Sequence, residues 1–67
     1  MFRERVVLED GVRYELYFRS PSDYRLACVK HGRVLVAYAP GGRYGFKSVE
    51  KLRYDFERDA EDALRQG

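Results

Sequence analysis

The chain has 67 residues, a formal net charge of +2 and 45% hydrophobic residues, with six tyrosines and four phenylalanines among them. It is too apolar for an intrinsically disordered protein, and no apolar run approaches the ~20 residues that cross a bilayer. Its only cysteine, Cys28, excludes an intrachain disulfide or a cysteine-rich metal site and favours a reducing, cytoplasmic compartment. The N-terminal residues lack the apolar stretch of a signal peptide. We therefore expect one cytoplasmic domain, residues 1–67, with a thin core.

The charge is unevenly distributed along the chain. Residues 1–47 carry nine basic and five acidic side chains, a balance of +4, whereas residues 48–67 carry four basic and six acidic ones, a balance of −2. This asymmetry indicates different roles for the two parts. The whole-chain charge is too small to indicate nucleic-acid binding by itself.

Two segments share one hairpin plan, with predicted strands at 2–8, 12–19, 24–30 and 33–39. A glycine stands third in each connection, Glu9-Asp10-Gly11 and Lys30-His31-Gly32, which favours a type I turn followed by a G1 bulge. That turn keeps apolar residues opposite apolar residues in both hairpins. The predicted pairs are Leu8–Val12, Val6–Tyr14 and Phe2–Phe18 in the first hairpin, and Cys28–Val34, Leu26–Val36 and Tyr24–Tyr38 in the second.

The turn-rich residues 19–23 link the two hairpins and, if they close a third antiparallel pair, set Leu16 opposite Leu26 and Tyr14 opposite Cys28. Pro40-Gly41-Gly42 ends the fourth strand, and residues 43–46 are either a fifth strand or a bent loop. Ser48 then has the character of an N-cap for a helix over about 49–65. The apolar stripe of that helix comprises Val49, Leu52, Phe56, Ala60, Ala63 and Leu64. The predicted fold is α+β, a four-stranded antiparallel meander, with that fifth strand left open, and one C-terminal α-helix on one face.

Alternation along the strands separates two faces of the sheet. Even-numbered strand residues form the core side, beneath the helix. Odd-numbered residues form the outer side, which carries every strand arginine and an exposed Tyr17. We expect partner binding there, through Arg3, Arg5, Arg13, Tyr17, Arg19, Arg25 and Arg33. The predicted rows across the sheet are Arg3-Tyr17-Arg25-Ala37, Arg5-Glu15-Ala27-Leu35 and Val7-Arg13-Val29-Arg33.

Ala27, Val29, Leu35 and Ala37 add a low apolar patch to this outer side. Strands that are apolar on both sides are typical of a sheet covered on both faces, because a solvated face carries polar residues throughout. Arginine and tyrosine are also enriched in binding hot spots. The alternative is an ordinary solvated face, on which arginines need no partner.

No catalytic, cofactor-binding or metal-binding constellation is visible, and we expect the protein not to be an enzyme and to have no small-molecule substrate or membrane partner. His31 falls in a predicted loop, and Cys28 points to the core, as an inert buried thiol does. The acidic helix residues are interpreted as a solvated face with like-charge and opposite-charge pairs at i, i+4. They are Asp55, Glu57, Asp59, Glu61 and Asp62.

Basic, aromatic and glycine residues alternate in the segment 42–47, as in single-strand binders, whose aromatic rings stack on bases. A second candidate site for nucleic acid therefore comprises Arg43, Tyr44, Phe46 and Lys47. The alternative is a glycine-rich connection in which Tyr44 and Phe46 close the edge of the core.

In order of elements, residues 24–66 resemble PC4-like single-stranded-DNA-binding domains. The resemblance runs through Gly32-Arg33-Val34-Leu35-Val36, Gly42-Arg43-Tyr44-Gly45-Phe46 and Asp59-Ala60-Glu61-Asp62-Ala63-Leu64. It implies single-stranded-DNA binding by the strands, although this chain has few lysines and the binding strands of that family are usually more basic. In size and build the chain is also similar to small phage-encoded inhibitors, including anti-CRISPR proteins.

Two functions follow as hypotheses. The first is a small non-enzymatic interaction or regulatory protein that docks its arginine- and tyrosine-bearing sheet face onto a macromolecule or a second copy of itself. The second is single-stranded nucleic-acid binding through the same arginines and the segment 43–47, with a steep loss of affinity as salt rises.

Overall fold

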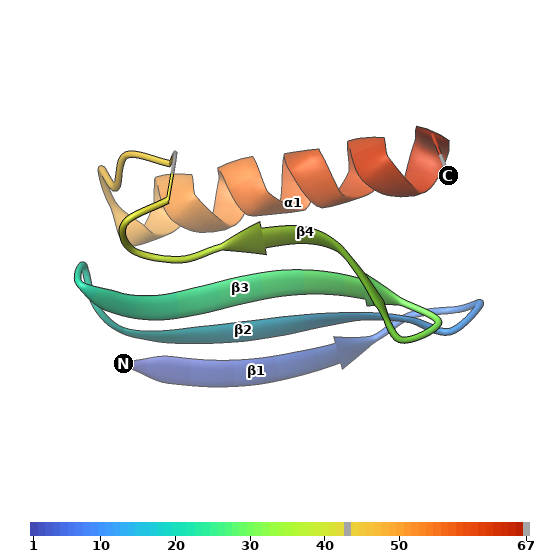
Figure 1. The fold of residues 1–67 in the computed structure, drawn as a ribbon. Coiled ribbons are helices and arrows are strands. Elements are labelled where there is room, and N and C mark those ends of the chain that lie inside the picture. Colours follow the sequence, from blue (N-terminus) through green and yellow to red (C-terminus); the bar gives the residue numbers. More distant parts are fainter. Residues whose placement is uncertain (43, 67) are drawn as a thin grey trace.

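The computed structural model describes residues 1–42 and 44–66, which form one antiparallel sheet and one helix (Figure 1). Strands β1 (Phe2–Val7), β2 (Val12–Ser20), β3 (Asp23–Lys30) and β4 (Arg33–Tyr38) lie in the order β1-β2-β3-β4. Helix α1 (Val49–Gln66) covers one face of the sheet and is not long and apolar enough to span a membrane. The predicted α+β meander with one C-terminal helix is confirmed. Residues 44–48 are neither strand nor helix.

The first hairpin has the predicted register but a different turn. Phe2 lies opposite Phe18 in the β1–β2 ladder, and the Leu8 N–H donates to the Val12 carbonyl at 2.8 Å. Asp10 and Gly11 both have positive φ, 60° and 71°. The predicted type I turn with a G1 bulge needs positive φ only at the glycine, so the turn prediction is wrong. Aspartate tolerates the left-handed region better than most residues, which explains its place here.

The β2–β3 pair also has the predicted register, with Tyr14 opposite Cys28 and Leu16 opposite Leu26. Both residues of each pair are buried. An irregularity between Phe18 and Ser20 ends the regular ladder at the tight link to β3. The central two strands therefore carry the alternation that the sequence predicts.

The second hairpin has a shorter turn than we predicted. Lys30 lies opposite Arg33, so the turn consists of His31 and Gly32, with φ values of 52° and 78°. Two successive positive φ values are typical of the type I′ turn, whose twist matches that of antiparallel strands. The two turns meet at one end of the sheet, where the His31 N–H donates to the Gly11 carbonyl at 3.0 Å.

A β-bulge then shifts the pairing of β4 with β3 by one residue. Val34 lies opposite Val29 and Val36 opposite Cys28, which leaves Leu35 without a partner in the ladder. The predicted pairs Cys28–Val34, Leu26–Val36 and Tyr24–Tyr38 are therefore wrong. Leu35, predicted on the outer side, packs against the core, whereas Val34, predicted in the core, is 51% exposed.

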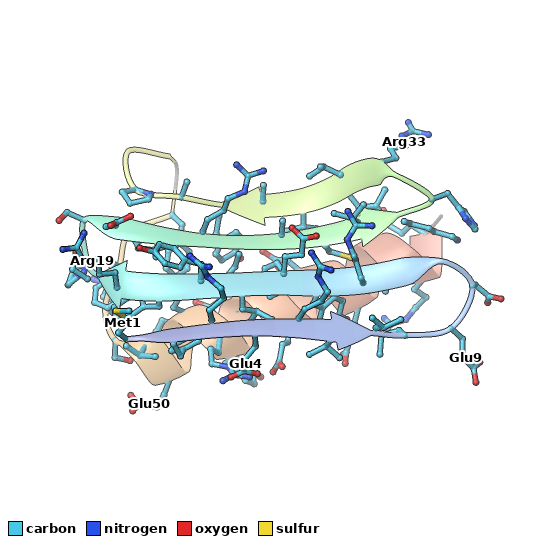
Figure 2. All side chains as sticks on the ribbon, turned by 90° about the horizontal axis from the view of Figure 1, so that it is seen from below. Met1, Glu4, Glu9, Arg19, Arg33 and Glu50 are labelled. Atoms are coloured by element: carbon cyan, nitrogen blue, oxygen red, sulfur yellow. The ribbon has the colours of Figure 1, made fainter. Side chains whose placement is uncertain are left out.

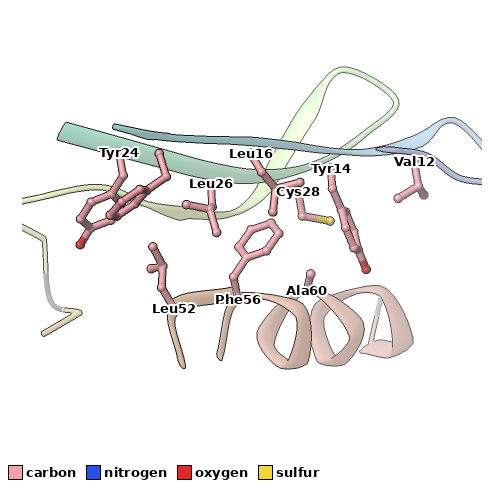
Figure 3. Close-up of a cluster of buried hydrophobic side chains, with 10 residues drawn as sticks. Val12, Tyr14, Leu16, Tyr24, Leu26, Cys28, Leu52, Phe56 and Ala60 are labelled. Atoms are coloured by element: carbon pink, nitrogen blue, oxygen red, sulfur yellow. The ribbon is translucent and has the colours of Figure 1, made fainter. Parts of the chain in front are cut away.

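The core lies between the sheet and α1 (Figure 3). Leu52, Phe56 and Ala60 of the helix stripe are completely buried, as are Leu26 and Cys28 of the strand beneath them. Each buried Leu or Phe side chain contributes about 1.5–3 kcal/mol of transfer free energy. The helix begins where the sequence predicts, and these contacts fix its position on the sheet.

Ser48 caps the start of α1. Its hydroxyl oxygen accepts a hydrogen bond from the Lys51 N–H at 3.1 Å, and its carbonyl accepts the first helical bond, from Leu52, at 2.9 Å. Glu50 lies in the first turn and Arg65 in the last, where the charge of each interacts favourably with the helix dipole. The predicted N-cap is confirmed.

Candidate binding surface on the outer face of the sheet

Six side chains from β1, β2 and β3 share the face of the sheet opposite α1. Arg3 lies opposite Tyr17 and Arg5 opposite Glu15, while Tyr17 lies opposite Arg25. Figure 2 views the sheet from this side, with the helix behind it. The face carries four guanidinium groups and one carboxylate, a balance of +3. We call the following set the arginine face: Arg3, Arg5, Arg13, Glu15, Tyr17 and Arg25.

Glu15 is the carboxylate at the centre of this set. Its Oε2 accepts a hydrogen bond from Arg13 Nε at 2.6 Å and lies 3.9 Å from Arg5 Nη2. The hydrogen bond from Arg13 holds the pKa of the Glu15 carboxyl below its ordinary value, with further support from the charges of Arg13, Arg5 and Arg25. One carboxylate thus serves two arginines. Within residues 1–42 and 44–66, no ion pair reaches Arg3 or Arg25.

Tyr17 is held by contacts at both its ring and its hydroxyl. The Arg3 guanidinium carbon lies 5.3 Å from the ring centroid, a cation–π arrangement. The hydroxyl donates to Asp23 Oδ2 at 3.3 Å, and the same oxygen lies 3.6 Å from Arg19 Nη1. Asp23 therefore balances Arg19, and the arginine face is most cationic around Arg3 and Arg25.

A shallow depression of about 490 Å³ lies over β1, β2 and β3 at this place. Tyr17, three arginines and two carboxylates contribute to its lining, the charged residues being Arg3, Arg5, Arg25, Glu4 and Glu15. A carboxylate or phosphate in this depression would meet several guanidinium groups, which bind such groups through paired N–H donors. The sequence predicted these residues on one face, and the structure brings them together.

Arg33 is a correction to that prediction. It lies opposite Lys30, and Lys30 lies opposite Val12, so Arg33 belongs to the row that carries the core residue Val12. The position predicted for Arg33, beside Val29, is occupied by Val34. The cause is the two-residue turn, which shifts the start of β4 by one residue relative to a three-residue turn.

The predicted low apolar patch is wrong at Leu35, which packs against the core. Ala27 and Val29 lie on the outer side as predicted, although they are only 1% and 5% exposed, and Ala37 lies opposite Ala27 and is exposed. Further exposed apolar surface on this side occurs at Val7 (75%) and Val34 (51%). These two valines lie at the two ends of the row that contains Arg13 and Val29, beside the arginines rather than among them.

The second candidate segment has a structural role for both of its aromatic rings. The Tyr44 ring stacks on Tyr38 at a centroid distance of 4.8 Å, and Phe46 stacks on Phe18 at 5.7 Å. Neither ring is a free platform for a base. Lys47 is exposed, and Arg43 lies outside the described residues. The alternative interpretation, a connection that closes the edge of the core, fits this geometry.

Asp55 is a further residue whose surroundings differ from the prediction. We interpreted it as part of a solvated helix face, yet it is only 4% exposed. Its Oδ2 accepts a hydrogen bond from the Tyr44 hydroxyl at 2.8 Å and lies 3.2 Å from Lys51 Nζ. The hydrogen bond from Tyr44 and the Lys51 ammonium keep the pKa of the Asp55 carboxyl below its ordinary value. The sequence predicts the i, i+4 pairing of Lys51 with Asp55, but it does not predict the hydrogen bond from Tyr44.

The tyrosines of this cluster are perturbed in the opposite direction. Burial and the hydrogen bond to Asp55 raise the pKa of Tyr44 to about 12. Burial and a hydrogen bond to Asp59 likewise raise the pKa of Tyr38, and the Tyr38 hydroxyl also donates to the Asp55 carbonyl at 3.2 Å. Asp55 thus ties the glycine-rich connection to the helix and serves the fold rather than a ligand.

Cys28 and His31, the remaining candidates for a catalytic or metal-binding role, lie in surroundings that do not form such a site. Cys28 is completely buried, and burial raises the pKa of its thiol. His31 is exposed within the two-residue turn. Across the part of the chain that the structure describes, no three His, Cys, Asp or Glu side chains are grouped as metal ligands would be.

The sequence matches no protein-family model, and comparisons with curated proteins and with solved structures found no match. The resemblance to PC4-like domains therefore rests on the order of elements and the quoted residues alone.

Proposed function

We propose that this protein is a small, non-enzymatic interaction or regulatory protein that docks its arginine face onto an acidic surface of a macromolecular partner. The observation that carries the proposal is the balance of +3 on the arginine face, on the side of the sheet opposite α1, with Arg3 and Arg25 outside the ion pairs of the described residues. A stable solvated face gains little from such an excess of like charge, whereas an acidic partner would neutralise it.

The mechanism is association and steric occlusion. Arg3 and Arg25 would pair with carboxylates of the partner, and Tyr17 would add a rigid contact surface between them. The excess charge would speed the encounter at low salt and lose its effect as ions screen it. A protein of this size acts by covering what it binds, as a regulator or inhibitor does.

A double substitution tests the proposal. Arg25→Glu combined with Tyr17→Ala reverses one charge and removes the ring at the centre of the arginine face. The matched control, Arg65→Glu with Tyr54→Ala, makes the same changes on α1, where Arg65 is 74% and Tyr54 64% exposed. We expect the first variant to lose at least about tenfold in affinity, or about 1.4 kcal/mol, for partners captured from an extract of the source cell. The control should retain them, and the proposal fails if both variants behave alike.

Single-stranded nucleic acid is the alternative partner, because phosphates also suit an arginine-rich face. The structure weakens this alternative by engaging Tyr44 and Phe46 in the core and by covering one side of Tyr17 with Arg3. Titration with a labelled oligonucleotide at low salt, together with light scattering for self-association, distinguishes three partners: a nucleic acid, a second copy of this chain and a different protein. Tight, salt-sensitive oligonucleotide binding that Arg25→Glu abolishes would favour nucleic acid over an acidic protein.

A further inference from the structure

Strand β1 has an open edge next to the arginine face. It is the first strand of the order β1-β2-β3-β4, and within the described residues no strand pairs with its other side. The hydrogen bond from the Leu8 N–H to Val12 shows which backbone groups point toward β2. Because these groups alternate along an antiparallel strand, Arg3, Arg5 and Val7 direct their N–H and C=O groups to the open edge.

The helix leaves the second half of β1 uncovered. It crosses behind the sheet at an angle (Figure 2), and near its start Arg53 pairs with Glu4 of β1 at 2.9 Å. Further along β1, Val6 is 36% exposed and Leu8 40% exposed, although both belong to the side that faces α1. A hollow of about 230 Å³ adjoins Leu8, and its other lining residues are Glu9, Asp10, Val12, Lys30 and Leu64.

Resting on the proposed function, we infer that the open edge of β1 accepts an extended segment of the partner protein as a fifth strand, in which acidic and apolar residues alternate. Neighbouring residues across a sheet share a face. The acidic side chains of the segment would lie beside Arg3 and Arg5, and its apolar side chains would cover Val6 and Leu8. Backbone hydrogen bonds would supply affinity, and the two rows of side chains would supply specificity.

A second copy of this chain is a less suitable strand for the edge. A two-fold pairing of β1 with itself centred on Glu4 sets Glu4 opposite Glu4 and Arg3 opposite Arg5, and one centred on Arg5 sets Arg5 opposite itself. Like charges directly opposite one another destabilise a strand pair. A pairing centred on Val6 sets Arg5 opposite Val7 and avoids like charges, but it gives neither Arg3 nor Arg5 an acidic neighbour within β1, whereas an acidic strand from a different protein neutralises both.

Nucleic acid also fits the edge poorly. It has no backbone that pairs with a strand edge, and it gains nothing from the exposed Val6, Val7 and Leu8. An extended peptide could pair with the open backbone groups of β1, neutralise Arg3 and Arg5, and cover the exposed aliphatic side chains.

A pair of substitutions at Val7 tests the role of the edge. Val7→Pro removes an N–H that points away from β2, so it costs no internal ladder bond, and proline is tolerated on edge strands. Val7→Ala keeps the N–H and is the matched control, since the Val7 side chain is 75% exposed. The probe is a labelled peptide of about eight residues, the length of an ordinary strand, in which Glu and Val alternate. A peptide of the same composition with all Glu before all Val controls for charge.

We expect the alternating peptide to bind the wild type and Val7→Ala, and to slow amide hydrogen exchange at Arg3 and Arg5. Binding to Val7→Pro should be at least about tenfold weaker. Should Val7→Pro not fold, Arg3→Glu with Arg5→Glu replaces it, and this variant should prefer an alternating Lys-Val peptide. Equal binding of the two Glu-Val peptides, unchanged binding by Val7→Pro, binding of an oligonucleotide but no peptide, or concentration-dependent dimers would each overturn the inference. If Arg25→Glu with Tyr17→Ala abolishes capture of the partner while Val7→Pro does not, the arginine face binds and the edge does not.

Discussion

The two faces of the sheet differ in composition and burial, although the same strands form both. Toward α1, β2 and β3 present Leu16, Leu26 and Cys28, which are at most 2% exposed and pack beneath Phe56. Away from α1, alternate residues of these strands and of β1 form the arginine face. The helix-facing side therefore supplies most of the buried apolar surface, although Ala27 and Val29 of the outer side are buried as well, and the arginine face is partly or fully exposed. Substitutions on the two faces should consequently differ in kind as well as in size.

The largest effect is expected on the helix-facing side. Phe56 is completely buried and makes edge contacts with Tyr14 at 5.5 Å and Tyr38 at 5.8 Å. Phe56→Ala should lower the free energy of unfolding by about 3–5 kcal/mol. That is a large fraction of the roughly 3–10 kcal/mol expected for a chain of this size. Urea unfolding followed by circular dichroism measures it.

The control removes an aromatic ring from the outer side. Tyr17→Ala should cost only about 1 kcal/mol, near the centre of the range for single substitutions, because the Tyr17 side chain is only partly buried. Equal losses in the two variants would mean that the outer side also carries folding free energy, and the division between the faces would not hold.

The sequence predicts this division well where alternation alone decides it. Strands β1 to β3 contain no bulge among Arg3, Arg5, Arg13, Tyr17 and Arg25, so counting residues places all of them on one face. Arg33 and Leu35 were misplaced, because Lys30-His31-Gly32 fits both a two- and a three-residue connection. Choosing between them requires knowing that β4 contains a bulge, which no local pattern shows.

Asp55 escaped prediction for a different reason. Its burial depends on Tyr44, eleven residues earlier in a connection without regular structure. Periodicity assigns Asp55 to the polar side of the helix, and only the path of the connection covers it. The sequence pattern thus predicts which face of a helix or strand a side chain lies on. It does not predict which side chains an irregular segment packs against that face.

Two carboxylates sharpen the comparison, because Asp55 and Glu15 both have a lowered pKa but lie on opposite sides of the sheet. A carboxyl whose pKa falls on folding stabilises the protein above its ordinary pKa, 3.8 for aspartate. This contribution is lost as the pH falls through the lower pKa of the folded state. At about pH 6, Asp55→Asn should therefore melt several degrees below the wild type.

The difference should shrink as the pH falls below about 3.8, where the wild type loses the same charge. Thermal melts across this range measure it. Asp62→Asn is the control, because Asp62 is exposed and pairs with Arg65 at 3.4 Å on the helix surface. A gap between Asp55→Asn and the wild type that stays constant with pH would mean that Asp55 acts through packing rather than through its charge.

The smallest change in stability is expected at Glu15, whose side chain is 39% exposed and whose ion pairs are screened by water and salt. Glu15→Gln should instead alter binding, because it removes the one carboxylate of the arginine face and raises its balance from +3 to +4. The alternating Glu-Val peptide should bind about two- to fivefold more tightly, with a steeper loss of affinity as salt rises. Glu57→Gln makes the same change in net charge on the exposed side of α1. Equal gains in both variants would assign the effect to the charge of the whole protein, whereas a gain confined to Glu15→Gln would assign it to the arginine face, where released Arg5 and Arg13 meet the incoming carboxylates.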